Sequence, residues 1–376
     1  MEQNTNRLYW AIGVIVIASF LLFGSLKVFG IDLLPKVTGK INNTFKEHEL
    51  KTWPTTLNGG NASVYSGSDE GSVDSAGFGQ ELLSDAKKMK LNTVTIPVVV
   101  AIDSQGSNSG EVLDYSLNRA LALSKIMSKN GIRTIIEPYP LIADGAVGES
   151  YFKPNDKSAF MDSWTGNVLS IIDAFKDEPT AGIYIGSNLT QLEDQNEAFN
   201  SLIKKARSSY SGKIIYRTNY WYNAVWDEAT TKAFQDKKAT PFFKNVDILS
   251  VAAYFELSSP DVFDVKTLQD RMSSTNVYSR QQNVLSQIRE LHEATGKEIM
   301  FGELGISNHE TSMSQPWNSQ LSTPVDDRIQ SIWYRAWIEQ LRKETWFNGY
   351  SIFAIGYKGE DLIPNEAAKQ TIASLN

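Results

Sequence analysis

Short runs of apolar, often β-branched residues recur along the chain from residue 93 onward, with more polar stretches between them. These runs are TVTIPVVVAI (93–102), RTIIEPY (133–139), AGIYIG (181–186), KIIYR (213–217), VDILSVAAY (246–254), EIMFG (298–302) and GYSIFAI (349–355). Continuous rather than alternating hydrophobicity is typical of strands that are buried on both faces, as in parallel sheets. The pattern therefore predicts seven parallel strands.

The stretches between these runs predict amphipathic helices. The clearest stretch (326–345) has apolar residues four apart, at Ile329, Trp333, Trp337 and Leu341. A second stretch contains Val284, Ile288 and Leu291. Positions four apart lie on one face of a helix, so each stretch can cover a sheet. The second helix is predicted to end at Gly296, because glycine is favoured just after a helix C-terminus.

An eighth strand is predicted near Thr52–Leu57, ahead of the seven clear ones. Eight strands alternating with helices over residues 52–376 indicate an α/β fold, a (β/α)8 TIM barrel. A doubly wound open sheet is the alternative. No strand is followed by a G-x-G-x-x-G or Walker A loop, and this favours the barrel.

The N-terminal segment has a different pattern, since Leu8–Leu26 carries no charged residue. As a helix it would span about 28 Å, close to the hydrocarbon thickness of a bilayer. A cleaved signal peptide is the alternative, but no A-x-A-like site follows. The predicted divisions are a short tail (1–7), a transmembrane anchor (8–30), a juxtamembrane linker (31–51) and the barrel (52–376).

The orientation of this anchor has conflicting signals. Lysines that follow the span favour a cytoplasmic C-terminus, whereas Arg7 stands alone before it. Large domains are translocated despite such charges, and an aromatic-rich barrel suits an extracellular polymer. We expect a single-pass protein of the cell membrane with an extracellular barrel.

Composition excludes several classes of function. The net charge of −7 argues against a nucleic-acid partner, which would need a basic surface. The absence of cysteine excludes disulfides and thiolate chemistry, and the three histidines form no ligand motif. We expect no metal and no cofactor.

Polar and aromatic residues stand at or just after the predicted strand ends, where the chemistry of a TIM barrel takes place. They are Asp103, Glu137, Tyr139, Asn188, Asn219, Tyr220, Trp221, Tyr254, Glu256, Glu303 and Tyr357. Aromatic faces pack against sugar rings, and amides and carboxylates bind hydroxyl groups. Each residue alone is better explained by packing, but the cluster TNYWYNAVW (218–226) favours a carbohydrate cleft.

The runs VDILSVAAYFEL (246–257), GKEIMFGELGIS (296–307) and TWFNGYSIFAIGYKGEDLIPNEAAKQTI (345–372) resemble glycoside hydrolase family 113. Its members are clan A retaining β-glycosidases with a (β/α)8 fold, typified by β-mannanases. The resemblance implies that Glu303 is the nucleophile and that Tyr254 supports it. It also implies a β-linked oligo- or polysaccharide as the partner.

The sequence departs from the family pattern after strand 4. The family has G-[NT]-E-L there, and IGSNLTQLE (185–193) places Asn188 at the position of the acid/base glutamate. A shift in register onto Glu193 is the alternative. The strand-8 run also lacks the tryptophan-rich segment that the family uses as a sugar platform.

Three hypotheses follow. An enzyme would need a substitute acid, for which Glu137, Asp103 and Glu256 are the candidates. A binding protein would keep the cleft without turnover, and a structural component of a cell-envelope polysaccharide assembly would need only the fold and the anchor. A structural ion pair between Glu303 and Arg217 or Arg133 is the alternative to a catalytic Glu303.

Overall fold

The computed structural model describes residues 47–64, 75–259, 264–356 and 362–376. The chain divides into two compact units, Met1–Glu49 and Leu50–Asn376, and the fold below belongs to the second. The predicted transmembrane anchor (8–30) and Tyr357 lie outside the described residues. Among the helices of the described ranges, none is long and apolar enough to cross a bilayer.

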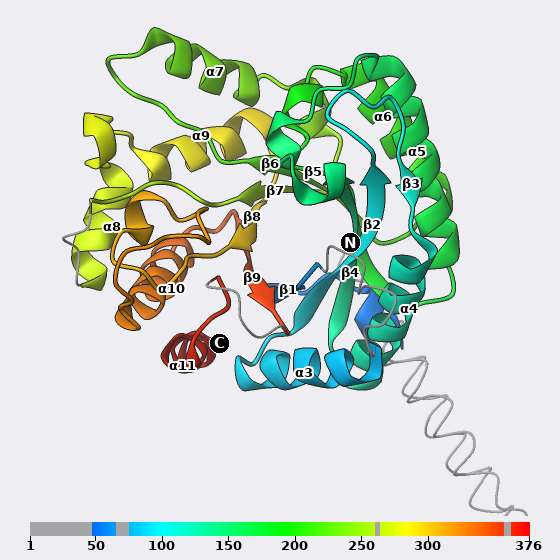
Figure 1. Ribbon diagram of the computed structural model, residues 1–376, viewed down its shortest axis with the longest axis horizontal. Helices are drawn as coiled ribbons and strands as arrows, with labels where there is room; N and C mark the ends of the chain where they lie inside the picture. The colour runs from blue at the N-terminus through cyan, green and yellow to red at the C-terminus, as the bar shows by residue number, and fades with distance from the viewer. Residues whose placement is uncertain (1–46, 65–74, 260–263, 357–361) are drawn as a thin grey trace, which may run out of the picture. The chain divides into compact units, whose positions relative to one another are not determined.

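Eight parallel strands form a closed barrel in the second unit (Figure 1). They are β1 (Leu57–Ala62), β2 (Thr93–Ile102), β4 (Arg133–Ile142), β5 (Thr180–Ser187), β6 (Lys213–Asn219), β7 (Ile248–Ala252), β8 (Ile299–Leu304) and β9 (Phe347–Ile355). Closure comes from β1, which pairs in parallel with both β2 and β9. The short strand β3 (Glu111–Val112) is antiparallel to the end of β2. The predicted (β/α)8 barrel is confirmed.

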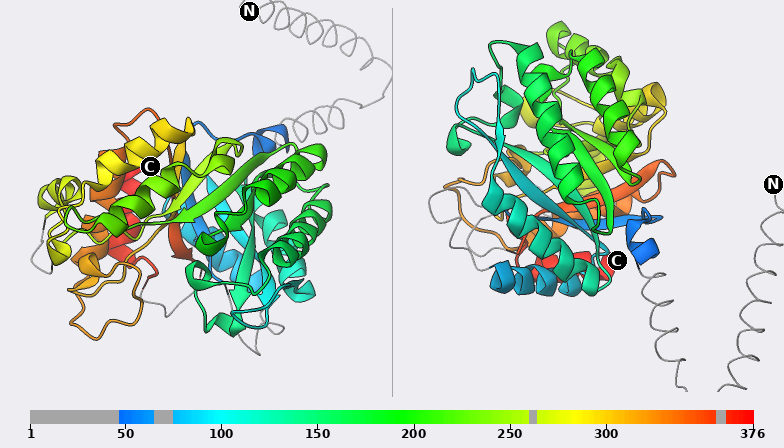
Figure 2. Two further views of the ribbon diagram at one scale, coloured as in Figure 1. Left: turned by 90° about the horizontal axis from the view of Figure 1, so that it is seen from above. Right: turned by 90° about the vertical axis from the view of Figure 1, so that its right-hand side faces the viewer.

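Helices lie around the outside of the strands, as the views of Figures 1 and 2 show. They are α3 (Ser75–Lys88), α4 (Asp114–Lys129), α5 (Lys157–Ala174), α6 (Asn196–Ser209), α7 (Glu228–Lys238), α8 (Val265–Ser273), α9 (Val284–Thr295), α10 (Arg328–Leu341) and α11 (Glu366–Leu375). The last helix, α11, packs against both α10 and α3, and this contact closes the helical layer.

Single-turn 3-10 helices stand in the connections between these elements. They are η3 (Ala143–Gly145), η4 (Glu149–Tyr151), η5 (Thr190–Leu192), η6 (Pro241–Lys244), η7 (Val277–Ser279) and η8 (Ser312–Ser314).

Two predicted helices have the expected form. In α10 the stripe through Trp333 and Trp337 is fully buried, and the two rings make an edge-to-face contact. Helix α9 ends before Gly296, whose φ of +67° is the left-handed conformation that glycine adopts without steric cost.

The first strand is shifted from its predicted place near Thr52–Leu57. Its sequence, LNGGNA, has no apolar run, because the neighbouring strands leave little room for side chains. A Cβ atom on Gly60 would lie 2.5 Å from Ile355 Cδ1. The segment before the strand packs differently: Trp53 lies against the apolar cluster inside the barrel. Trp53 therefore contributes to the core, although its segment is not a strand.

The inside of the barrel is apolar at one level and charged at the next. Its apolar level consists of Leu57, Ile135, Tyr184, Ile215, Ile248 and Met300. Side chains along a strand alternate between the two faces, so a residue two positions after one of these also points inward. Glu137 follows Ile135 on β4 and Arg217 follows Ile215 on β6, and both are buried. The core thus supports a charged layer nearer the strand ends.

Candidate active site

Arg217 lies at the centre of the charged layer and is almost fully buried. Its Nη2 atom is 2.9 Å from Glu303 Oε1 and also pairs with Glu137 Oε1. One guanidinium therefore serves two carboxyl groups. Burial raises the pKa of Glu137 and the charge of Glu303 raises it further, although Arg217 opposes both effects.

The side chain of Glu303 enters the mouth of the barrel because of an irregularity in β8. Met300 points into the barrel, so strict alternation would turn Glu303 outward. The register of β8 against its neighbours shifts around Gly302 and Glu303. Such bulges re-aim side chains near active sites.

Gly302 makes room for Arg217. A Cβ atom at this position would lie 2.0 Å from Ser250 Oγ and 2.9 Å from Arg217 Cδ. The Gly302 carbonyl accepts a hydrogen bond of 2.8 Å from Asn61 Nδ2, so β1 also fixes this peptide. Gly302, the first glycine of FGELG, is therefore needed for Arg217 to reach both Glu137 and Glu303.

Two neutral donors also bind the Glu303 carboxylate. The hydroxyl of Tyr254 donates to it, and burial together with the charge of Glu303 raises the pKa of Tyr254 well above the ordinary value. Asn188 Nδ2 donates to Glu303 Oε1 over 3.1 Å. Because an ionised carboxylate only accepts hydrogen bonds, the amide must turn its nitrogen toward Glu303. Asn188 Oδ1 is then buried, and it has no hydrogen-bond partner in the described part of the chain.

The backbone at Asn188 has a left-handed conformation, with φ of +54°. Its N–H donates to the Arg217 carbonyl over 2.8 Å, and its own carbonyl accepts from Thr190 N over 2.7 Å. Asparagine tolerates this conformation better than most residues with a side chain. The turn after β5 thus aims the amide at Glu303.

Glu149, which the sequence reading missed, belongs to the same group of charges. It begins η4 in the loop after β4, and it is half-buried. The hydroxyl of Tyr139 donates to its carboxylate. Burial raises the pKa of Glu149, and the charge of Glu303 raises it further. A lone acid in the loop sequence AVGESY gives no signal by itself, because only the folded loop brings it to the mouth.

Glu256 lies at the rim in a separate cluster. Its Oε2 atom pairs with Arg280 Nη1 at 2.7 Å, while Oε1 accepts from the Tyr222 hydroxyl and from Trp317 Nε1. The guanidinium of Arg280 lies over the Tyr222 ring, 4.2 Å from its centroid. Trp317 is 46% exposed, so this cluster presents an aromatic surface.

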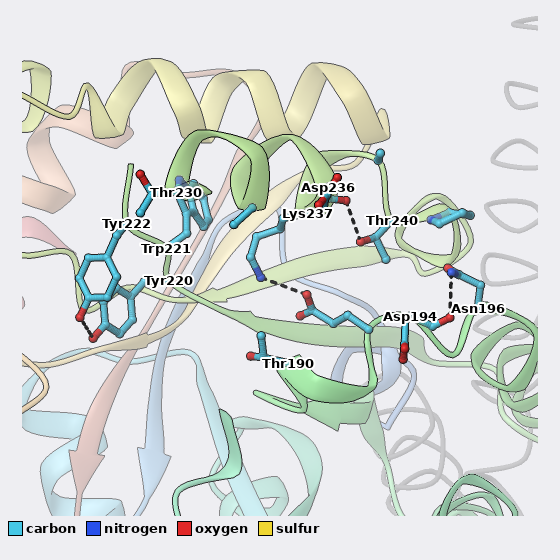
Figure 3. A pocket seen from close by; sticks show the side chains of 14 residues that line it. Thr190, Asp194, Asn196, Tyr220, Trp221, Tyr222, Thr230, Asp236, Lys237 and Thr240 are labelled. Carbon is cyan, nitrogen blue, oxygen red and sulfur yellow. Dashed lines mark hydrogen bonds and ion pairs between the residues drawn. The ribbon is translucent and has the colours of Figure 1, made fainter. Parts of the chain in front are cut away.

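Glu193 lies in a different pocket, which is shown in Figure 3 and has a volume of about 560 Å³. Its Oε2 atom pairs with Lys237 Nζ at 3.1 Å, and its Oε1 atom accepts from the Thr218 hydroxyl over 2.6 Å. Tyr216 and Thr218 alternate with the inward Arg217, so this pocket is on the outer face of β6. Glu193 therefore lies away from Glu303 and does not take the position of the acid/base residue.

The aromatic cluster after β6 divides between the pocket and the mouth. Trp221 lines the pocket, stacks on Phe234, and donates from Nε1 to Gln287 Oε1 over 2.8 Å. The Tyr220 ring lies between the two places: it also lines the pocket and makes an edge contact with Tyr254. Trp221, which the sequence placed among the residues of the expected carbohydrate cleft, therefore lies on the pocket side.

The remaining predicted residues lie at the edge of this arrangement. Asp103 is exposed and lines a hollow of about 440 Å³ together with Asp144. Asn219 Oδ1 accepts a hydrogen bond from the backbone N–H of Tyr220. Within the described ranges, no cluster of acidic residues and histidines could hold a metal ion.

Comparison with known proteins identifies the family. The model of Glycoside Hydrolase Family 113 matches residues 147–371, which is more than half of the chain. The protein belongs to glycoside hydrolase family 113. The matched range includes Asn188, Arg217, Tyr254 and Glu303, whereas Glu137 and Tyr139 precede it. No curated protein matches the sequence at a significant level.

Solved structures with the same fold include other members of family 113. One described as a GH113 β-1,4-mannanase has a TM-score of 0.68 and 14% sequence identity, over 86% of this chain and 99% of that chain. The GH113 β-mannanase AaManA from Alicyclobacillus acidocaldarius has a TM-score of 0.67 and 16% identity, over 85% and 97% of the two chains. A family 1 β-glucosidase from Thermotoga maritima is more distant, with a TM-score of 0.54 and 11% identity over 86% and 98%.

Proposed function

We propose that this member of family 113 is a retaining β-glycosidase that acts on a β-linked polysaccharide, with Glu303 as the nucleophile. The observation that carries the proposal is the set of donors on the Glu303 carboxylate. Arg217 pairs with it, while Tyr254 and Asn188 donate hydrogen bonds that orient it. An oriented carboxylate at the mouth of a barrel is the group that attacks an anomeric carbon in retaining enzymes.

Asn188 stands, in this proposal, at the place where the family has its acid/base glutamate. An amide has no proton to give to a leaving oxygen, so a retaining reaction would need a second carboxyl group from elsewhere. Glu256 and Glu193 are engaged by Arg280 and Lys237 outside the mouth. Glu137 shares Arg217 with Glu303, which makes it a charge partner rather than a proton donor.

Activated glycosides test the nucleophile separately from the proton donor. The similar structures described as β-1,4-mannanases make mannose-based probes the first choice. We expect 2-deoxy-2-fluoro-β-mannosyl fluoride, or its β-glucosyl counterpart, to form a stable adduct with the protein. Mass spectrometry of the digested protein should place the added mass on the peptide that contains Glu303. A panel of such probes that gives no adduct would contradict the proposed function.

A carbohydrate-binding protein without turnover is the second candidate. It is favoured by the buried Asn188 Oδ1 atom, which can accept a hydrogen bond from a sugar hydroxyl. Calorimetry with mannotetraose distinguishes the two functions. Binding that is lost in Asn188→Ala, together with no adduct from any probe, would favour this second candidate.

We also infer a membrane location from the uncharged run Leu8–Leu26, with the barrel extracellular and close to cell-envelope polysaccharide machinery. Full-length protein is expected to stay in the membrane fraction after a carbonate wash. A variant that begins near Ile41 is the control and is expected in the supernatant. Release of the full-length protein by carbonate would show that the run does not span the bilayer.

A further inference from the structure

The loop after β4 lies against the turn that carries Asn188. Its helix η4 packs on η5, which begins two residues after Asn188. Gln191 Nε2 in η5 donates to the carbonyl of Ser150, the neighbour of Glu149, over 3.3 Å. Glu149 therefore comes from a neighbouring loop to the side of the mouth where the family has its acid/base residue.

The partners of Glu149 differ from those of the other buried acids. Glu137, Glu193 and Glu256 are each paired with a cation. Glu149 instead accepts a hydrogen bond from Tyr139, a neutral phenol, and it interacts through space with both Glu303 and Arg217. It is half-buried, so it combines a partly desolvated position with access to a ligand in the mouth.

We propose that Glu149 is the general acid/base of this protein, which has moved from the end of β5 to the loop after β4. The proposal rests on the proposed function, because it needs Glu303 to act as the nucleophile. In this proposal Asn188 orients Glu303 and binds a hydroxyl group of the sugar. Proton transfer is carried out by Glu149, a position that the family pattern does not include.

The reaction has two steps, formation and then hydrolysis of the glycosyl-enzyme. Glu303 attacks the anomeric carbon, the bond from that carbon to the leaving oxygen breaks, and the Glu149 carboxyl gives its proton to this oxygen. A water molecule then attacks the same carbon and gives a proton to the Glu149 carboxylate, while the ester bond to Glu303 breaks. Both groups return to their starting forms.

The surroundings of Glu149 suit this exchange of a proton. A general acid works best when its pKa is close to the working pH, and burial and the Glu303 charge both raise that of Glu149. Formation of the ester at Glu303 removes this negative charge, so the Glu149 pKa falls when the residue must act as a base. Tyr139, Arg217 and a backbone hydrogen bond act in the opposite direction and favour the ionised form of Glu149.

Two substrates with different leaving groups test the proposal in the full-length protein. In Glu149→Gln, formation of the glycosyl-enzyme from 2,4-dinitrophenyl β-mannoside should change by only a few fold, because this leaving group departs without a proton. Cleavage of mannotetraose should fall by roughly 10²–10⁴-fold. Azide, which needs no base, should restore release of the glycosyl group as glycosyl azide.

The pH profile gives a second measurement. Mannotetraose cleavage by the wild type should fall as the pH rises through the Glu149 pKa, above the ordinary glutamate value of about 4.3. Tyr139→Phe removes a hydrogen bond that favours the carboxylate, so this basic limb should move to higher pH. Asp144→Asn is the matched control, because Asp144 is on the same loop but is exposed. This variant should leave the rate of mannotetraose cleavage and the basic limb of its pH profile unchanged.

The outcomes separate this proposal from the proposed function. A Glu303 adduct in the wild type, with equal losses on both substrates in Glu149→Gln or no loss at all, would overturn only the role of Glu149. Absence of the adduct would overturn both. If Glu149→Gln does not fold, Glu149→Asp keeps a carboxyl group and should retain part of the mannotetraose activity. Full activity in any variant without a carboxyl group at position 149 would refute the role of Glu149 as the general acid/base.

Discussion

Glu303→Gln is expected to lower turnover of 2,4-dinitrophenyl β-mannoside by at least about 10⁴-fold, since an amide cannot form the glycosyl ester. The replacement keeps the shape of the side chain, so Tyr254 and Asn188 still have a polar neighbour. The adduct with the 2-fluoro probe should also disappear. Steady-state rates and intact-protein mass spectrometry measure the two effects on the same samples.

Glu193→Gln is a matched control for this experiment, because Glu193 is a similarly buried and cation-paired acid on the outer face of β6. It should lose some stability and keep both the turnover and the adduct. Equal losses in the two variants would mean that the activity reports on folding, and unchanged turnover in Glu303→Gln would remove Glu303 from the reaction.

Arg217→Met is expected to lower the free energy of unfolding by about 3–5 kcal/mol, because removing one partner leaves buried charges uncompensated. Two carboxylates, Glu137 and Glu303, lose the same cation. In the variant Glu137 keeps its burial and its Glu303 neighbour but loses the cation that opposes both effects, so the pKa of Glu137 in the folded state rises further. Chemical denaturation followed by tryptophan fluorescence measures the change.

The sign of the pH dependence follows from the raised pKa of Glu137. The loss of stability in Arg217→Met should be greatest near neutral pH and should shrink as the pH falls and the Glu137 carboxyl group becomes protonated. Arg335→Met, which breaks an exposed pair with Glu339 on α10, should cost about 1 kcal/mol or less. A loss in Arg217→Met that is small, or that does not depend on pH, would show that the three charges are not coupled.

Most of the barrel could be predicted because its strands are continuous apolar runs. The strand β2 is the clearest case, since its predicted range of 93–102 is the observed one. The strand β1 could not be placed, because its glycines are required by close neighbours and give no hydrophobic pattern. Its position depends on packing against β2 and β9, which are distant in the sequence.

The site was predictable where it lies on strand ends. Asn188, Tyr254 and Glu303 were expected at one mouth, and the structure brings them together. The ion pair between Arg217 and Glu303 was expected only as the alternative to a catalytic Glu303, with Arg133 as the other possible cation. A sequence does not show which strand residues share a level of the barrel. Glu149 escaped prediction because its place depends on the contact between two loops.

The left-handed turn at Asn188 limits which side chains this position can carry. A glutamate there would have to adopt a φ of about +54°, which costs a longer side chain roughly 1 kcal/mol more than asparagine. Asn188→Glu alone would therefore place a longer side chain on a main chain that favours an amide, beside Glu303 and Glu137. The turn and the neighbouring loop would have to change together before a glutamate could take this conformation without strain.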